Sequence, residues 1–247
     1  MTTSRIIRIA MWSGPRNLST AMMRTFGNRP DTVAVDEPFY AAYLAATNIT
    51  HPMRAEIMGS QPTDPADVIA SLQAELPGDA TIHYQKHMTH HMIPQVPRDW
   101  MADVRNAFLI RAPDRVLASY TAKRSDVTVE DLGFPQQVEL FEHVKTLTGQ
   151  RPPVIDTDDL LANPEGLLRA LCKALDIRFS ETMLSWPAGR WACDGVWGSH
   201  WYGAVEKSTG FGPASPSPIL TDPAHLDIIA AAQPAYDALA AERLQAI

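Results

Sequence analysis

The sequence predicts an α/β fold in which a central parallel sheet of about four or five strands is flanked by helices. Short runs with β-strand composition alternate with amphipathic segments, which is the pattern of parallel strands joined by crossover helices. Each run is followed by turn-forming residues and then by a helical pattern. Strands are expected at residues 6–11, 32–35, 81–85, 107–110 and 154–156.

Proline marks the starts of three expected helices, because a proline at the first helical position gives up no hydrogen bond. These prolines are Pro113, Pro164 and Pro223. Ser19 and Thr20 can cap a helix that follows the first strand. Further helices are expected over 67–76 and 135–148, and Pro234 is expected to kink or split the last helix.

The composition is that of one globular domain. The chain has 247 residues, of which 45% are hydrophobic and 20% charged, so it can bury a core without disulfides or metals. A single domain is expected over residues 1–247, with a C-terminal wrapping segment from about residue 190. Within that segment, residues 210–218 are rich in Pro, Ser and Gly and are expected to follow the surface.

Charge and cysteine content exclude several function classes. With 28 acidic and 21 basic side chains the net charge is -7, so neither nucleic acid nor an anionic membrane is an expected partner. Cys172 and Cys193 provide neither a disulfide framework nor the spacing of a zinc site. Without a secretory signal or membrane span, the protein is expected to be cytoplasmic. Whether it forms a homodimer is left open.

The loop between the first strand and the first helix is a candidate anion site. Residues 12–20 read WSGPRNLST, and the N–H groups and positive dipole end of the helix attract phosphate there. Arg16 adds a fixed positive charge, and the hydroxyls of Ser19 and Thr20 can donate to the same oxygens. The alternative is a capped helix behind a turn.

This loop does not fit the phosphate loop of nucleotide kinases. With Ser19 on the last position of Gly-x-x-x-x-Gly-Lys-Ser/Thr, the two glycines and the lysine are all missing. It resembles instead the Pro-Arg/Lys-x-x-Ser/Thr-Thr phosphosulfate loop of the sulfotransferase superfamily. Pro15, Arg16, Ser19 and Thr20 match that loop, whereas Asn17 and Leu18 replace its common Ser-Gly.

A second motif supports the same resemblance. That family binds 3′-phosphoadenylyl sulfate (PAPS) and carries a strand ending in Arg, followed by Pro, with Ser eight residues beyond the Arg. Here these residues are Arg111, Pro113 and Ser119. The resemblance implies that Arg111 and Ser119 hold the 3′-phosphate of PAPS. The alternative for Arg111 is an ion pair with Asp114 or another nearby acid.

The resemblance also implies a fold and an activity. The fold is a P-loop NTPase-like three-layer sandwich, and the activity is sulfuryl transfer from PAPS to a hydroxyl or amine of a small-molecule acceptor, without a metal. The C-terminal Arg-Lys-Gly-x-x-Gly clamp of the family is absent, and residues 194–202 occupy roughly that region. The implied cosubstrate-binding residues are Gly14, Pro15, Arg16, Asn17, Leu18, Ser19, Thr20, Arg111 and Ser119.

Two residues compete for the role of catalytic base. Residues 37–39 resemble the Glu-Pro-Phe element of bacterial sulfotransferases, in which the glutamate is the base, so Glu37 is the first candidate. Its alternative role is a helix N-terminal acid. Lys86 and His87 approximate the Lys-x-His of cytosolic sulfotransferases, displaced by one, which makes His87 the rival base and Lys86 an aid to the leaving oxygen. With Arg16, these are the catalytic candidates.

Two other clusters leave alternatives open. Residues 81–91 contain four histidines, but zinc is not expected because they need not converge, and His90 and His91 are expected in a solvated loop. The tryptophans at 186, 191, 197 and 201 form either an aromatic lid or ordinary packing. The rival functions are a P-loop kinase of a small metabolite and a nucleotide-binding protein that has lost transfer.

Overall fold

The computed structural model describes residues 6–122, 127–213, 216 and 219–247. Five parallel strands form one sheet in the order β2-β3-β1-β4-β5, which confirms the predicted fold class. Parallel pairing places every carboxyl end at one edge of the sheet, where ligands bind in such folds. The strands are β1 (Ile7–Ser13), β2 (Thr32–Asp36), β3 (Ile82–Met88), β4 (Arg105–Ile110) and β5 (Val154–Asp156).

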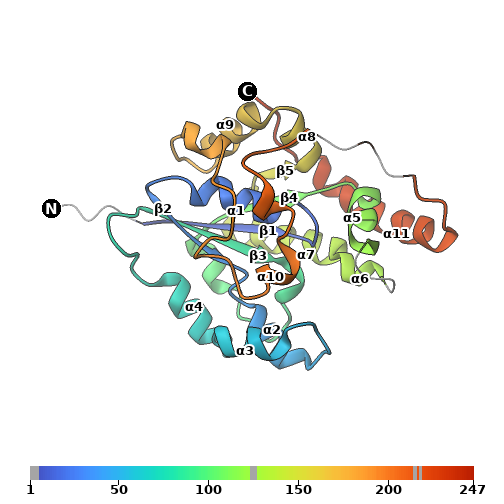
Figure 1. Ribbon diagram of the computed structural model, residues 1–247, viewed down its shortest axis with the longest axis horizontal. Helices are drawn as coiled ribbons and strands as arrows, with labels where there is room; N and C mark the ends of the chain where they lie inside the picture. The colour runs from blue at the N-terminus through green and yellow to red at the C-terminus, as the bar shows by residue number, and fades with distance from the viewer. Residues whose placement is uncertain (1–5, 123–126, 214–215, 217–218) are drawn as a thin grey trace.

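Helices cover both faces of the sheet and complete a three-layer sandwich (Figure 1). The α-helices are α1 (Ser19–Gly27), α2 (Tyr40–Thr47), α3 (Arg54–Ser60), α4 (Pro65–Gln73), α5 (Pro113–Thr121), α6 (Val129–Leu132), α7 (Phe134–Thr148), α8 (Thr157–Ala162), α9 (Pro164–Ala174), α10 (Gly198–Trp201) and α11 (Pro223–Ala240). Short 3-10 helices are η1 (Thr89–His91), η2 (Asp99–Asp103), η3 (Glu181–Leu184) and η4 (Val205–Lys207).

Two apolar clusters show why the layers form. On one face, Phe26 of α1 and Leu171 of α9 pack with Met11 of β1. On the other face, Phe141 of α7 packs with Trp12 and with residues of α4 and η2. Adjacent residues of β1 therefore enter different cores, as the alternation of a strand buried on both faces requires.

Of the two outcomes expected for Pro234, the split of the last helix is wrong. Helix α11 continues through this proline without being split. Pro234 removes the hydrogen bond to the carbonyl of Ala230, but both residues are exposed, so water can satisfy that carbonyl. Ala232 and Leu239, on either side of the proline, are buried and hold the helix against the domain.

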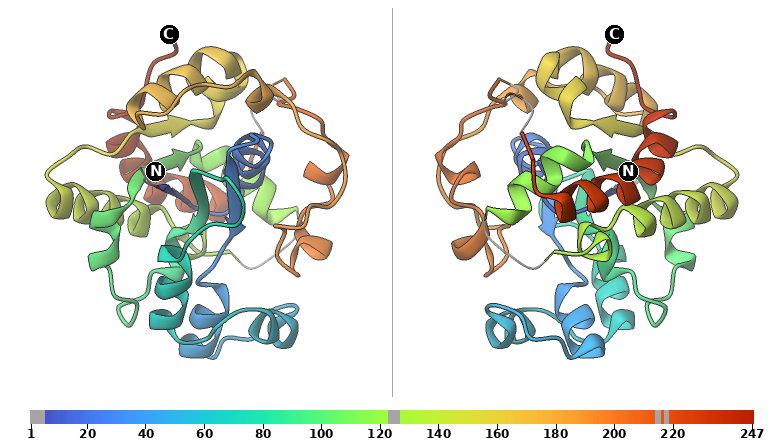
Figure 2. Two further views of the ribbon diagram at one scale, coloured as in Figure 1. Left: turned by 90° about the vertical axis from the view of Figure 1, so that its left-hand side faces the viewer. Right: turned by 90° about the vertical axis from the view of Figure 1, so that its right-hand side faces the viewer.

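Residues 175–213, after α9, follow the surface of the sandwich. Figure 2 shows this segment in orange as an arc along one side of the molecule that leads down to α10. It is tied to the sandwich by Arg24 of α1, which pairs with Asp194. Residues 214, 215, 217 and 218 of the expected surface segment 210–218 lie outside the described residues. Within the described part of the chain, no helix is long and apolar enough to span a bilayer.

Candidate active site

The loop after β1 presents an uncapped helix start. Arg16 and Leu18 adopt left-handed φ angles of 62° and 57°, a backbone alternation that turns successive N–H groups toward one point. The expected capping by Ser19 or Thr20 is wrong, because the N-cap of α1 is Leu18, whose side chain cannot accept a hydrogen bond. No acidic residue lies in the first turn. These features fit an anion better than they fit a capped turn.

Two residues of the loop hold its shape. Asn17 is buried and donates from Nδ2 to the carbonyl of Leu109 on β4 at 3.1 Å. Gly14 has no room for a side chain, because a Cβ there would lie 2.8 Å from the backbone oxygen of Leu132. The loop is therefore held in place by its contacts with β4 and with the end of α6.

The two sequence motifs meet at this loop. Arg16 donates from Nε to Ser119 Oγ at 2.9 Å, and Arg111 donates from Nη1 to the backbone oxygen of Arg16 at 2.8 Å. Arg111 lies at the carboxyl end of β4, and Ser119 lies on α5. Tertiary structure thus joins residues that are about a hundred positions apart in sequence.

The two arginines lack a paired carboxylate. In the described part of the chain, neither Arg16 nor Arg111 forms an ion pair, and Asp158 pairs instead with Arg115. The Nε of Arg111 is buried without a hydrogen-bond partner among the described residues. Burial lowers the pKa of both guanidinium groups. The charges of Asp158 and Asp114 oppose this effect for Arg111, but neither carboxylate pairs with it in the described part of the chain. Two half-buried cations without an ion-paired carboxylate favour an anionic ligand over the ion pair with Asp114.

Glu37 lies in a buried charged cluster at the ends of β2 and β3. Lys86 donates from Nζ to Asp36 Oδ1 at 2.8 Å, to Glu37 Oε1 at 2.5 Å and to the Tyr202 hydroxyl at 3.1 Å. The side chains of Asp36 and Lys86 are each 1% exposed, whereas that of Glu37 is 11% exposed. Glu37 is therefore the carboxylate of the cluster that reaches toward solvent.

The neighbouring charges and the burial of the cluster shift the pKa of both Glu37 and Lys86. Burial raises the pKa of Glu37, and the charge of Lys86 opposes that rise. Burial lowers the pKa of Lys86, but the charges of Asp36 and Glu37 outweigh it, and the net pKa is raised well above its ordinary value. The cluster therefore holds a charged ammonium beside a carboxylate of raised proton affinity, as a general base requires.

His87 faces the opposite side of β3 from Lys86, because adjacent residues of a strand alternate. Its ring stacks on Trp12 with ring centroids 4.4 Å apart, and its Nε2 lies 3.2 Å from Gln85 Oε1. Burial lowers the pKa of His87 to about 3. This environment is that of a core histidine, and it favours Glu37 as the base.

The expectation of a solvated position is wrong for His91, and His90 is half-buried. His91 is 2% exposed, and its ring stacks on Tyr40 and Tyr43 of α2 at centroid distances of 4.5 and 4.9 Å. Helix α2 covers η1, and burial lowers the pKa of His90 to about 4. The described residues contain no group of three or more His, Cys, Asp or Glu arranged to hold a metal.

The tryptophan-rich segment fixes the C-terminal region. Trp186 and Trp197 are 3% and 1% exposed, so packing explains these two better than a lid does. Trp191 covers the guanidinium of Arg24 at 4.7 Å. Arg24 and Asp194, whose side chains are fully buried, pair through two bonds of 2.5 and 2.6 Å.

Sequence reasoning missed four residues of this region: Arg24, Asp36, Asp194 and Tyr202. Asp36 could have been found, since it precedes Glu37 at a strand end that carries other candidates. Tyr202 lies 116 positions from the lysine that it contacts, and no local pattern marks such a pair.

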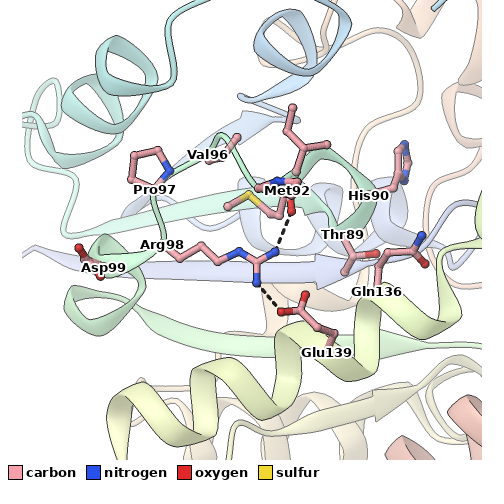
Figure 3. A pocket seen from close by; sticks show the side chains of 11 residues that line it. Thr89, His90, Met92, Val96, Pro97, Arg98, Asp99, Gln136 and Glu139 are labelled. Carbon is pink, nitrogen blue, oxygen red and sulfur yellow. Dashed lines mark hydrogen bonds and ion pairs between the residues drawn. The ribbon is translucent and has the colours of Figure 1, made fainter. Parts of the chain in front are cut away.

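A groove of about 810 Å³ lies beside the loop, between η1, η2 and α7 (Figure 3). Apolar residues such as Met92 and Val96 form one wall, and Arg98 crosses the groove to pair with Glu139 at 2.5 Å. Thr89, at one end, donates to the backbone oxygen of Ser13. The residues that line the groove do not include those of the Glu37 cluster.

The chain belongs to the sulfotransferase domain family, whose pattern it matches over residues 7–243. Solved structures of that class share its fold. They include the sulfotransferase domain of the Synechococcus PCC 7002 olefin synthase, at a TM-score of 0.58 and 17% identity over 95% of this chain and 96% of that domain. A sulfotransferase from Alicyclobacillus acidocaldarius gives a TM-score of 0.54 and 12% identity over 98% of both chains.

Curated relatives are similar in sequence but longer. Branched-chain-amino-acid aminotransferase-like proteins 1 and 2 of Arabidopsis thaliana are 35% and 33% identical to this chain over 231 residues. These residues make up 94% of this chain but only 41% of each relative.

Proposed function

We propose that this chain is a PAPS-dependent sulfotransferase that transfers a sulfuryl group to a hydroxyl or amine of a small-molecule acceptor. The observation that carries the proposal is the contact of Arg16 with Ser119 and Arg111 at the uncapped start of α1. A doubly phosphorylated adenosine needs positive charge for two phosphates at neighbouring positions. Among the described residues, this corner of the sheet offers such charge without an ion-paired carboxylate.

The residues fit PAPS in two groups. The loop amides, Arg16, Ser19 and Thr20 would hold the 5′-phosphosulfate, and Arg111 with Ser119 would hold the 3′-phosphate. The orphaned Nε of Arg111 supports this fit, since a buried donor without a partner costs about 1–3 kcal/mol. PAPS supplies an activated sulfuryl group whose leaving group is a phosphate.

The chemistry then needs a base and charge stabilisation. Glu37 would take the proton of the acceptor hydroxyl or amine as the acceptor atom bonds to sulfur and the bond from sulfur to the phosphate oxygen breaks. Arg16 would stabilise the charge on that oxygen. All three N–H groups of Lys86 have partners here, so its predicted help to the leaving oxygen would require an exchange of one partner.

Calorimetry and turnover test the proposal together. Adenosine 3′,5′-bisphosphate should bind more tightly than ADP or AMP, and labelled PAPS should be consumed with one of a panel of phenols, alcohols and amines. Binding of ATP with magnesium-dependent turnover would favour the kinase instead. PAPS that binds but is never consumed would favour a non-catalytic nucleotide-binding protein.

Glu37→Gln tests the base. The variant should bind adenosine 3′,5′-bisphosphate within about threefold of the wild type, while kcat should fall by about 10²–10⁴-fold. Glu56→Gln, at an exposed position of α3, is the matched control and should keep full turnover. Unchanged turnover in Glu37→Gln would move the base elsewhere, with His87 next to be tested.

A further inference from the structure

Asp36 receives hydrogen bonds from three separate parts of the fold. Lys86 of β3 donates to its Oδ1 at 2.8 Å. The Tyr202 hydroxyl, after α10, donates to its Oδ2 at 2.7 Å, and the backbone N–H of Gly195 donates to the same oxygen at 3.1 Å. Asp36 is 2% exposed, so its contacts are with protein groups rather than with solvent.

The hydroxyl of Tyr202, like the carboxylate of Asp36, makes three hydrogen bonds. It accepts from Lys86 Nζ at 3.1 Å and from Trp197 Nε1 at 3.0 Å while it donates to Asp36. One donor and two acceptor positions of the hydroxyl are thereby all used. A hydroxyl with this full set of partners is suited to hold neighbouring groups in place, and it has no proton left for an acceptor molecule.

The backbone aims Glu37 at this network. Glu37 has a left-handed φ of 41°, a conformation that costs free energy for a residue with a side chain. Its N–H donates to the carbonyl of Lys86 at 2.9 Å, and Gln61 donates to its carbonyl at 3.1 Å. These bonds hold the strained residue so that its carboxylate meets Lys86.

We propose that Asp36 and Tyr202 are positioning residues that share the ammonium of Lys86 with Glu37, so that the C-terminal segment completes the catalytic base. The inference rests on the proposed function of Glu37. The inference also assigns the segment around Asp194 a role in holding Asp36. Arg24 of α1 pairs with Asp194, and the N–H of the next residue, Gly195, donates to Asp36.

The charge balance gives the reason for this sharing. A lysine paired with Glu37 alone would hold that carboxylate ionised and weakly basic. With Asp36 present, the formal charges of Asp36, Glu37 and Lys86 are -1, -1 and +1, and one negative charge is left over. Lys86 lowers the pKa of Glu37, and Asp36 raises it. Asp36 therefore offsets part of the effect of Lys86.

The other titratable groups near the cluster come from packed neighbours. Burial and then the charge of Glu37 raise the pKa of Tyr40 on α2. The hydroxyl of Tyr202 donates to Asp36. Burial lowers the pKa of His91 on η1, and the charges of His90 and Lys86 lower it further. Within the described residues, these groups face the cluster along with Asp36.

The experiment measures the protonation of Glu37 directly. In protein labelled with ¹³C at the glutamate side-chain carboxyls, Glu37→Gln identifies the resonance of Glu37, which is then titrated in three variants. Asp36→Asn should lower the pKa of Glu37, and Lys86→Met should raise it, each by about one pH unit or more. Tyr202→Phe should raise it by less, because the hydroxyl that donates to Asp36 no longer offsets part of the negative charge of Asp36.

Turnover provides the second readout. The acidic limb of the kcat profile should shift in the same direction as the titration, and the plateau kcat of Asp36→Asn should fall on the order of tenfold. Tyr236→Phe is the matched control. Tyr236 lies on α11, and its hydroxyl donates to Asp156 at 2.6 Å, so the variant also removes one Tyr–Asp hydrogen bond. It should leave both readouts unchanged.

The outcomes separate this inference from the proposed function. If Glu37→Gln abolishes turnover but Asp36→Asn and Tyr202→Phe keep the wild-type titration and pH profile, the positioning roles are wrong and the base stands. If the titrations shift in opposite directions as expected but Glu37→Gln remains active, the base assignment is wrong. Should Lys86→Met not fold, the opposite signs expected for Asp36→Asn and Tyr202→Phe still decide the question.

Discussion

Arg111 is the residue whose replacement tests the proposed PAPS site most sharply. In the structure, its Nη1 supports the loop through the carbonyl of Arg16, whereas its Nε has no partner among the described residues. The guanidinium therefore has free donors for one phosphate. Each charge-assisted hydrogen bond to a phosphate contributes about 1.5–3 kcal/mol. Arg111→Ala should thus weaken the binding of adenosine 3′,5′-bisphosphate by about 10- to 150-fold.

Calorimetry with two nucleotides separates the two functions of this side chain. AMP lacks the 3′-phosphate, so its affinity should change by less than about threefold if Arg111 reads that phosphate. Arg115→Ala removes a nearby arginine that pairs with Asp158, and it serves as the control with little effect expected on either nucleotide. An equal loss for both nucleotides in Arg111→Ala would refute the assigned role and would show that Arg111 supports only the loop.

Two further predictions concern stability. Asp194→Asn leaves the fully buried Arg24 without its carboxylate and should lower the free energy of unfolding by about 3–5 kcal/mol in urea denaturation; a loss below about 1 kcal/mol would contradict the value placed on this pair. His87 has its pKa lowered to about 3, so between that value and about 6.5 the unfolded chain binds more protons than the folded one. Stability should therefore fall by about 1.4 kcal/mol per pH unit from this histidine as the pH drops below about 6.5, and the slope should decrease in His87→Gln; an unchanged slope would show that His87 is not buried as a neutral ring.

Local patterns in the sequence determined the sheet and the phosphate motifs. Strand-like runs, prolines at helix starts and the turn after each strand are properties of neighbouring residues, and the five strands and most of the helices follow them. Arg16 and Arg111 were predicted from a resemblance to motifs of the sulfotransferase superfamily, supported by the position of each after a strand and before a helix. Parallel pairing alone then brings both loops to one edge of the sheet.

Features that depend on distant contacts were predicted poorly. The expected cap at Ser19 or Thr20 failed because the loop turns through the left-handed Leu18 before the helix begins. The expected exposure of His91 failed because α2, earlier in the chain, packs over η1. Histidines near a turn read as polar loop residues until the segment that covers them is known.

What the sequence by itself determined is the order of elements, the position of the candidate anion-binding loop and the identity of Glu37 as a candidate base. Only the tertiary structure decided that Tyr202 and Asp36 share Lys86 with Glu37, and that His87 faces a core of aromatic rings. The physical reason is that a strand or a helix start is encoded within a few residues, whereas the proton affinity of a buried group is set by whichever charges the fold brings within a few ångströms of it.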